Sequence, residues 1–196
     1  MTIFTKEELR NYYKNERLKL SSNEVLKKSE QICELFFQFF DKQNLRWLHT
    51  YIPIESKNEP NTWPIIKKWL KSKNDRLVIV PKICDNYTME HFILENDFAT
   101  EVDKKGIITA KSTKKFLYKP DLVILPLLAY DYQGNRVGYG KGYYDRFLAQ
   151  IPNIPKIGLS FFKPVEQISD IQIWDVTLDY CITPETIYSF NLSNSY

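Results

Sequence analysis

Four glycines fall within nine residues of this chain, although the whole sequence of 196 residues contains only six. Gly134, Gly138, Gly140 and Gly142 follow a short apolar run and precede a segment that we expect to be helical. Alternate glycines allow backbone N–H groups to turn toward a common centre, because no Cβ atom stands in the way. Such amides, with the positive end of a following helix, form an anion site. Residues 134–142, here named the glycine loop, are therefore predicted to bind phosphate.

Two cations, Arg136 and Lys141, lie inside the glycine loop and would complement the charge of a phosphate chain. The alternative is a flexible loop without a ligand. We favour the phosphate site, because scarce glycines and two cations cluster directly after an apolar strand. Both common templates are excluded: a P-loop requires Ser or Thr where Gly142 stands, and a dinucleotide fingerprint requires Gly where Tyr143 stands.

Further charged residues have two interpretations each when they are considered alone. Asp145, at the expected helix start, could bind Mg²⁺ carried by a nucleotide or simply favour the helix dipole. Lys6 and Arg10 are four residues apart and share a helix face, which could clamp phosphate or a carboxylate but is more typical of a solvated face. Glu59 lies in a polar stretch, where a carboxylate is usually solvated.

The composition is typical of a soluble globular protein, with 43% hydrophobic residues, 26% charged residues and a net charge of +3. This small positive charge argues against a nucleic-acid-binding protein. Cys33, Cys84 and Cys181 are far apart, and we expect buried or half-buried thiols. His49 and His91 have no matched partners, so neither predicts a metal site or a catalytic triad. Because no apolar run has the length of a signal peptide or a membrane span, we expect a cytoplasmic chain without a membrane partner.

Helices and short strands must position these side chains. Capping boxes at Thr5–Glu8 and Ser21–Glu24 predict helices over 5–20 and 21–40. Further helices are expected at 63–71 and 142–150, and strands at 46–52, 77–80 (ending at Pro81), 89–94, 121–125, 157–160 and 180–183. This alternation predicts one α/β domain over residues 1–196, with a central, largely parallel sheet flanked by helices. Ligands bind such sheets beyond the carboxyl ends of the strands.

A long motif in the second half of the chain resembles the signature of the 5-formyltetrahydrofolate cyclo-ligase family. It consists of Pro126-Leu127-Leu128-Ala129-Tyr130-Asp131 and then Gly134-x-Arg136-x-Gly138-x-Gly140-x-Gly142-Tyr143-Tyr144-Asp145-Arg146. Three other segments also resemble the family: Lys6-x-x-Leu9-Arg10, Tyr51 with Glu59-Pro60-Asn61-Thr62, and Asp175-Val176-Thr177-Leu178-Asp179. The chain departs from the family at Thr109-Ala110, where Glu-Pro is usual, and at Pro164, where a late Gln is frequent. These departures concern the substrate pocket rather than the glycine loop.

The resemblance implies a fold similar to that of ribose-phosphate isomerase and glucosamine-phosphate deaminase. It also implies an ATP- and Mg²⁺-dependent ligase that converts 5-formyltetrahydrofolate to 5,10-methenyltetrahydrofolate and releases ADP and phosphate. Phosphoryl transfer to the formyl oxygen would create a leaving group, which a neighbouring folate nitrogen displaces. Small molecules would be the only partners, and we expect a monomer that binds no nucleic acid.

The resemblance also assigns roles to residues. Arg136 and Lys141 would be catalytic, and Asp145 and Asp175 would bind the metal. The expected ATP-binding residues are Lys6, Arg10, Arg136, Val137, Gly138, Tyr139, Gly140, Lys141, Gly142, Tyr143 and Tyr144. The expected folate-binding residues are Arg10, Ile54, Glu59, Tyr139 and Tyr143. Two rivals remain: a sugar-phosphate enzyme or sensor, which would need no adenine site, and a nucleic-acid-binding module, which should carry more positive charge.

Overall fold

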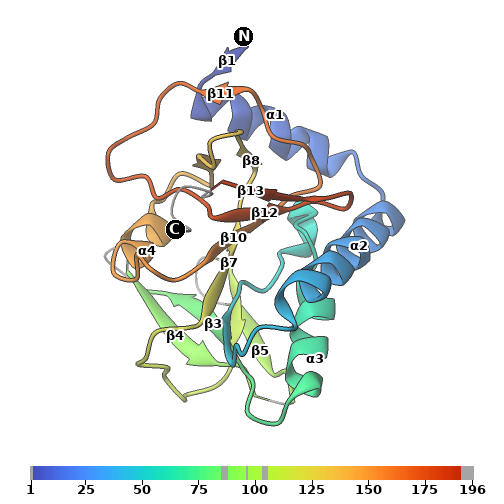
Figure 1. The fold of residues 1–196 in the computed structure, drawn as a ribbon, viewed down its shortest axis with the longest axis vertical. Coiled ribbons are helices and arrows are strands. Elements are labelled where there is room, and N and C mark those ends of the chain that lie inside the picture. Colours follow the sequence, from blue (N-terminus) through green and yellow to red (C-terminus); the bar gives the residue numbers. More distant parts are fainter. Residues whose placement is uncertain (1, 85–87, 96, 103–105, 191–196) are drawn as a thin grey trace.

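A seven-stranded sheet runs through the centre of the molecule in a computed structural model that describes residues 2–84, 88–95, 97–102 and 106–190 (Figure 1). Its strands, in spatial order, are β13 (Ile187–Ser189), β12 (Tyr180–Ile182), β10 (Lys156–Leu159), β7 (Leu122–Pro126), β2 (Trp47–His49), β3 (Leu77–Ile83) and β4 (Met89–Ile93). The strands from β12 to β3 are parallel to their neighbours, and β13 and β4 pair antiparallel at the two edges. The predicted central, largely parallel sheet is confirmed.

Helices cover both faces of this sheet, with α2 (Ser22–Phe40) and α3 (Trp63–Ser72) on one side and α4 (Tyr143–Leu148) on the other (Figure 1). The apolar side chains of strand β7 contribute to the cores on both faces of the sheet. Leu122 and Ile124 belong to the core beneath α2 and α3, whereas Val123 and Leu125 belong to the core that includes Leu148 of α4. Successive strand side chains point to opposite faces, so a strand covered on both sides is apolar throughout.

The first two helices begin at the predicted capping boxes. Thr5 caps α1 (Lys6–Leu18) and Ser21 caps α2, and in each case the Glu three residues later accepts from the cap's backbone N–H. Each cap satisfies helix N–H groups that have no partner within the helix, which is worth about 1 kcal/mol. These local signals therefore fix where α1 begins, and with it the position of the cations on its first turns.

A third, smaller core lies between α1 and the segments around the glycine loop. It contains Leu9 of α1 together with Ala129, Val137, Val165 and Ile168. Short strand pairs form part of this layer, namely β1 (Ile3–Phe4) with β11 (Gln167–Ile168), and β8 (Ala129–Tyr130) with β9 (Arg136–Val137). Another pair, β5 (Thr100–Val102) with β6 (Ile108–Ala110), and the 3₁₀-helix η1 (Glu55–Lys57) complete the elements. The sequence did not predict these short elements.

Some predicted boundaries are wrong. Strand β2 ends at His49 rather than at residue 52, and β3 does not stop before Pro81 but continues to Ile83. The N–H of Leu94 donates to the carbonyl of Val78, so the alternating ladder turns the nitrogen of Pro81 away from β4. On the other side, pairing with β2 ends at Ile79. Because no ladder bond is required from position 81, proline is tolerated within the strand. The fourth helix is also shorter than the predicted range 142–150.

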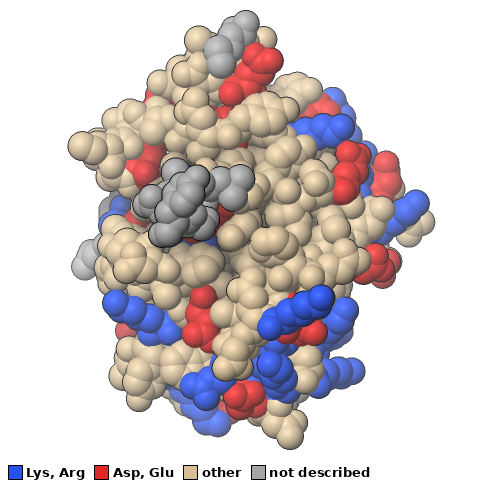
Figure 2. Space-filling view, viewed as in Figure 1, with Lys and Arg blue, Asp and Glu red and all other residues tan. Residues whose placement is uncertain are grey.

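Charged side chains are mixed on the surface. On the face shown in Figure 2, Lys and Arg lie among Asp and Glu. Among the described residues, no helix is both long enough and apolar enough to cross a membrane. Cys33 and Cys181 are buried and Cys84 is half-buried, and none of the three forms a disulfide, as the sequence predicted.

Candidate active site

A cleft of about 1060 Å³ opens beyond the carboxyl ends of β2 and β7, where Tyr51, Ile52 and Pro126 line it. Its volume matches that of a small-molecule site. The predicted site residues that line it are Lys6, Arg10, Ile54, Glu59, Arg136, Gly138, Tyr139, Gly140, Lys141, Gly142, Tyr143, Tyr144, Asp145 and Asp175. The fold therefore gathers in one cleft segments that are far apart in the sequence.

Val137 is the exception among the predicted residues. Its side chain is buried with Leu9 and Ala129, and it does not line the cleft. Along strand β9 the side chains alternate, so Arg136 faces the cleft and Val137 faces the third core. A direct role for the Val137 side chain in ATP binding therefore finds no support in its position.

The glycine loop uses glycine where the backbone requires it. Gly140 has φ of 84° and Gly142, which caps α4, has φ of 65°. Residues with a Cβ atom rarely adopt such backbone angles. A Cβ atom at Gly140 would lie 3.3 Å from Nε of Arg10, so the loop also approaches α1 closely. A Cβ atom at Gly138 would meet nothing within 4 Å.

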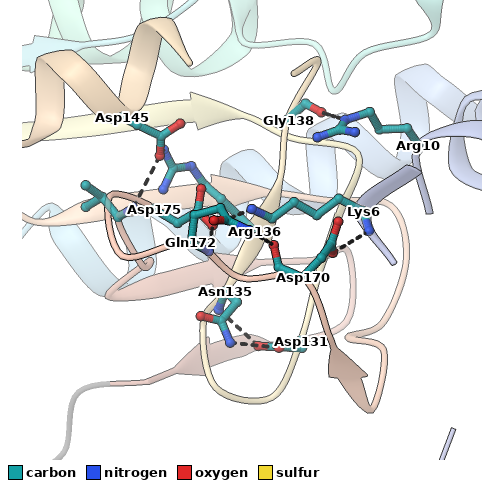
Figure 3. Close-up of polar contacts among 11 residues, drawn as sticks. Lys6, Arg10, Asp131, Asn135, Arg136, Gly138, Asp145, Asp170, Gln172 and Asp175 are labelled. Carbon is teal, nitrogen blue, oxygen red and sulfur yellow. Dashed lines mark hydrogen bonds and ion pairs between the residues drawn. The ribbon is translucent and has the colours of Figure 1, made fainter. Parts of the chain in front are cut away.

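A buried carboxylate fixes the base of this loop. Asp131 Oδ1 accepts from the backbone N–H groups of Gln133 and Asn135, both at 3.0 Å. Its Oδ2 accepts from the side-chain amide of Asn135 at 2.9 Å (Figure 3). It also accepts from the N–H of Ile168 at 3.2 Å. Asp131 thus holds the turn that leads into Arg136 and ties it to β11.

Both cations at the start of α1 face the cleft. Lys6 forms an ion pair with Asp175, and Arg10 Nε donates to the carbonyl of Gly138 at 3.0 Å (Figure 3). Lys6 is only 9% exposed, so the interpretation of this pair as a solvated face is wrong. The structure places both side chains against the segments that the sequence singled out for phosphate and metal.

Arg136 and Asp145 form a second ion pair, with 2.6 Å between Nη2 and Oδ1. Asp145 also accepts from the N–H of Val176 at 3.2 Å. Burial lowers the pKa of Arg136, and the carboxylate of Asp145 opposes that shift. Nη1 of Arg136 and the hydroxyl of Tyr144 are buried, and neither has a hydrogen-bond partner within the described part of the chain. A ligand with anionic oxygens would satisfy such a donor.

The two predicted metal ligands lie close together, because Val176, which contacts Asp145, directly follows Asp175. Within the described ranges, no three His, Cys, Asp or Glu side chains gather around a common point. Two carboxylates suit Mg²⁺, which commonly binds one or two carboxylates together with substrate phosphates. Both carboxylates already have cationic partners, Arg136 and Lys6, so a metal would have to compete with these cations.

On another wall of the cleft, Glu59 is buried at 4% exposure and holds two donors. Its Oε2 accepts from the N–H of Ile54 at 2.8 Å, and its Oε1 accepts from the hydroxyl of Tyr139. That hydroxyl accepts in turn from Nη2 of Arg17 at 2.6 Å. Burial, followed by the charge of Glu59, raises the pKa of Tyr139, so its hydroxyl stays a donor. Tyr51 donates to the carbonyl of Pro60 at 2.9 Å and steadies the same loop.

Sequence reasoning missed several residues of this site. Arg17 carries a signal that could have found it: positions 6, 10 and 17 repeat along one helix face. Lys57, whose ammonium lies 4.6 Å from the centre of the Tyr139 ring, has no such signal. Ile173 and Trp174, which are 97% and 66% exposed and line the cleft, stand directly before Asp175.

His49 and His91 are partners of each other, contrary to the expectation from sequence. Nε2 of His49 lies 3.0 Å from Nδ1 of His91, and both rings pack against Phe147 of α4. Burial lowers the pKa of both, to about 4 for His91. The pair is therefore neutral at pH 7 and supports the helix that follows the glycine loop.

Comparisons with known proteins identify the family of this chain. Residues 3–184 match the 5-formyltetrahydrofolate cyclo-ligase family. The 5-formyltetrahydrofolate cyclo-ligase of Mycoplasma genitalium is 32% identical over 143 residues, which are 72% of this chain and 74% of that protein. The structure of 5,10-methenyltetrahydrofolate synthetase from Aquifex aeolicus has a TM-score of 0.81 and 24% identity, and covers 97% of this chain and 95% of its own. The synthetase structure from Mycoplasma pneumoniae has a TM-score of 0.72 and 27% identity, with coverages of 93% and 100%. This chain therefore belongs to the 5-formyltetrahydrofolate cyclo-ligase family, a family of ligases.

Proposed function

We propose that this chain converts 5-formyltetrahydrofolate to 5,10-methenyltetrahydrofolate, with ATP as the phosphoryl donor and with ADP and phosphate as products. Family membership supports the reaction. One structural observation carries the assignment to residues: cationic side chains and the Glu59–Tyr139 pair line the same cleft. A single cleft of this kind allows a nucleotide and a folate to meet.

The phosphate side of the cleft is formed by Lys6, Arg10, Arg136 and Lys141. The developing charge in phosphoryl transfer is spread over phosphate oxygens, and fixed cations stabilise it. Arg136 is fixed by Asp145, whereas Lys141 is exposed on the glycine loop. We assign Arg136 to binding the phosphate chain. We assign Lys141 to stabilising the charge of the phosphoryl group as it is transferred.

The folate side is formed by Glu59 and the segment around Ile54. Reduced pterins present several N–H donors, and a carboxylate is the matching acceptor. Each oxygen of Glu59 holds one protein donor and keeps capacity for another. Tyr139 and Tyr143 line the cleft beside the phosphate cations, and we place them between the two ligands.

The task of these residues is to bring the formyl oxygen and the terminal phosphate into line and to exclude water. Phosphoryl transfer turns the formyl oxygen into part of a leaving group. The neighbouring folate nitrogen then attacks the activated carbon, and phosphate leaves as the ring closes. Mg²⁺, held by Asp145 and Asp175, would neutralise phosphate charge during the transfer.

A direct assay tests the proposal. Purified protein is mixed with 5-formyltetrahydrofolate, ATP and Mg²⁺, and the absorbance of the methenyl product is followed together with ADP release. We expect product and ADP in equal amounts, and neither when ATP is omitted. ADP release without methenyl product, or binding of sugar phosphates in place of ATP, would contradict the proposal and favour the sugar-phosphate alternative.

A further inference from the structure

Among the described residues, Arg17 is the most deeply buried cation near the cleft, although it does not line the cleft. It is 3% exposed, lies on the last turn of α1, and donates through Nη2 to the hydroxyl of Tyr139 at 2.6 Å. A second donation, from Nη1 to the carbonyl of Leu127, is longer at 3.4 Å. The shorter of these two hydrogen bonds goes to Tyr139, which lines the cleft. This suggests that Arg17 positions Tyr139.

The contact with Arg17 determines which way the Tyr139 hydroxyl points. Arg has donors only, so the hydroxyl oxygen must accept from it and direct its own hydrogen elsewhere. That hydrogen is donated to Oε1 of Glu59. Arg17 therefore sets the orientation of the donor that Glu59 receives, without touching Glu59 itself.

Helix α1 also holds the loop that carries Glu59. The side-chain amide of Asn58 donates to the carbonyls of Arg17 and Leu20, both at 2.9 Å. Asn58 adopts φ of 46° to make this contact, directly before Glu59. The carboxyl end of α1 and the residues after it therefore contact the folate side of the cleft at two points, Tyr139 and Asn58.

The opposite end of the same helix holds the nucleotide side. Arg10 donates to the carbonyl of Gly138, the residue before Tyr139, and its guanidinium packs against Gly140. Arg10 and Arg17 are two turns apart on α1 and contact adjacent residues of the glycine loop. A shift of the glycine loop on phosphate binding would therefore change the position of Tyr139 relative to Arg17.

We propose that Arg17 is a positioning residue that couples the two ligands, because it holds Tyr139 where the glycine loop and Glu59 meet. The inference rests on the proposed function, since it takes Glu59 as the folate-binding carboxylate. Ordering of the glycine loop by nucleotide prepares the Tyr139–Glu59 pair for folate. By linkage, folate tightens nucleotide binding by the same factor.

Calorimetric titration of the full chain tests this coupling. 5-Formyltetrahydrofolate is titrated with and without saturating AMP-PNP and Mg²⁺. In the wild type we expect AMP-PNP to tighten folate binding about tenfold, a typical value for coupled sites. In Arg17→Met and Tyr139→Phe the effect should fall below about twofold. In Arg17→Met, which changes a residue outside the cleft lining, the Kd of AMP-PNP alone should change by less than about threefold. Arg17→Lys, which keeps one donor for the hydroxyl, should restore part of the coupling.

Lys14→Met is the matched control, because Lys14 is an exposed cation on α1 that does not line the cleft. It should keep the full wild-type coupling. Should Arg17→Met fail to fold, Tyr139→Phe and Arg17→Lys decide the question. Full coupling in Tyr139→Phe, or none in the wild type, would overturn the role of Arg17. Absence of folate binding by the wild type would instead refute the proposed function.

Discussion

Arg136 of the glycine loop and Asp145 on the first turn of α4 face each other, with Nη2 and Oδ1 2.6 Å apart. The ion pair is largely buried, since the Arg136 side chain is 6% exposed and that of Asp145 is 25% exposed. Each residue is thus both a candidate ligand-binding group and the other's partner. Changes at this pair should affect ligand binding and stability together, and the predictions below separate the two.

Lys141→Ala should reduce turnover without reducing stability. Lys141 is exposed on the loop, and its removal takes away a cation for the transferred phosphate. We expect kcat/KM for ATP to fall about tenfold to a hundredfold, with an unchanged melting temperature. Lys119→Ala, at an exposed position outside the cleft, is the matched control. Near-normal kinetics in Lys141→Ala would remove its assigned role.

Glu59→Gln should raise the KM for folate more than that for ATP. The amide keeps one acceptor but brings an NH₂ group against either Ile54 N–H or the Tyr139 hydroxyl, and it loses the charge that pterin donors favour. We expect about a tenfold rise in the folate KM. Glu55→Gln, an exposed change on η1, serves as control. Equal effects on both substrates would argue against a folate-specific role for Glu59.

Asp145→Asn should weaken the effect of Mg²⁺ on nucleotide binding. It also leaves the buried Arg136 without its carboxylate, so we expect a loss of stability of about 1 to 3 kcal/mol. Nucleotide is titrated by calorimetry with and without Mg²⁺, and stability is measured by urea unfolding. Asp75→Asn, which alters an exposed pair with Arg46 at 3.8 Å, controls for charge. A full wild-type Mg²⁺ effect in Asp145→Asn would place the metal elsewhere.

Gly140→Ala and Gly138→Ala should differ in stability. Position 140 has a positive φ and a close neighbour in Arg10, whereas a Cβ atom at position 138 has no neighbour within 4 Å. We expect Gly140→Ala to cost about 1 kcal/mol or more, and Gly138→Ala to cost nothing measurable. Thermal unfolding of the two variants gives the comparison. If they are equally stable, the loop does not hold Gly140 in this conformation.

The two histidines should make stability depend on pH between about 6.5 and 4. The pKa of His91 is about 4 in the folded chain and 6.5 without burial, so the unfolded state binds more protons in this window. Stability is therefore complete above pH 6.5 and is lost as the pH falls toward 4. His91→Asn, which keeps an acceptor near the position of Nδ1, should reduce this slope. Parallel stability curves for wild type and variant, measured by urea unfolding across the window, would contradict the burial of a neutral pair.

Local patterns predicted much of the fold and of the candidate site. Capping boxes depend on residues three positions apart, so Thr5 and Ser21 could be identified directly. The glycine loop could be identified because positive φ values favour glycine, and because its cations are visible as Arg and Lys in the sequence. The central strands are short apolar runs, and their parallel order follows from the alternation with helices. The roles assigned to individual site residues stay predictions.

Properties that depend on tertiary contacts could not be predicted in this way. The spacing of positions 6, 10 and 17 can place these cations on one helix face, but it does not predict their burial. Only packing against distant segments buries Lys6 and Arg17. Proline often ends a strand, but β2 stops pairing with β3 before Pro81, so the nitrogen of Pro81 faces no strand that needs a hydrogen bond from it. Strands β8 and β9 have two residues each and no periodicity that a sequence could display.

The turn around Asp131 has a consequence for binding affinity. Its carboxylate accepts hydrogen bonds from Gln133, Asn135 and Ile168, and these bonds need no ligand. Folding itself therefore fixes the backbone that leads to Arg136. The conformational entropy of that segment is lost when the chain folds, and a ligand does not have to supply it again. Substitution of Asp131 would transfer this entropic cost from folding to each binding event. Such a variant would bind nucleotide more weakly even though Asp131 lies outside the cleft lining.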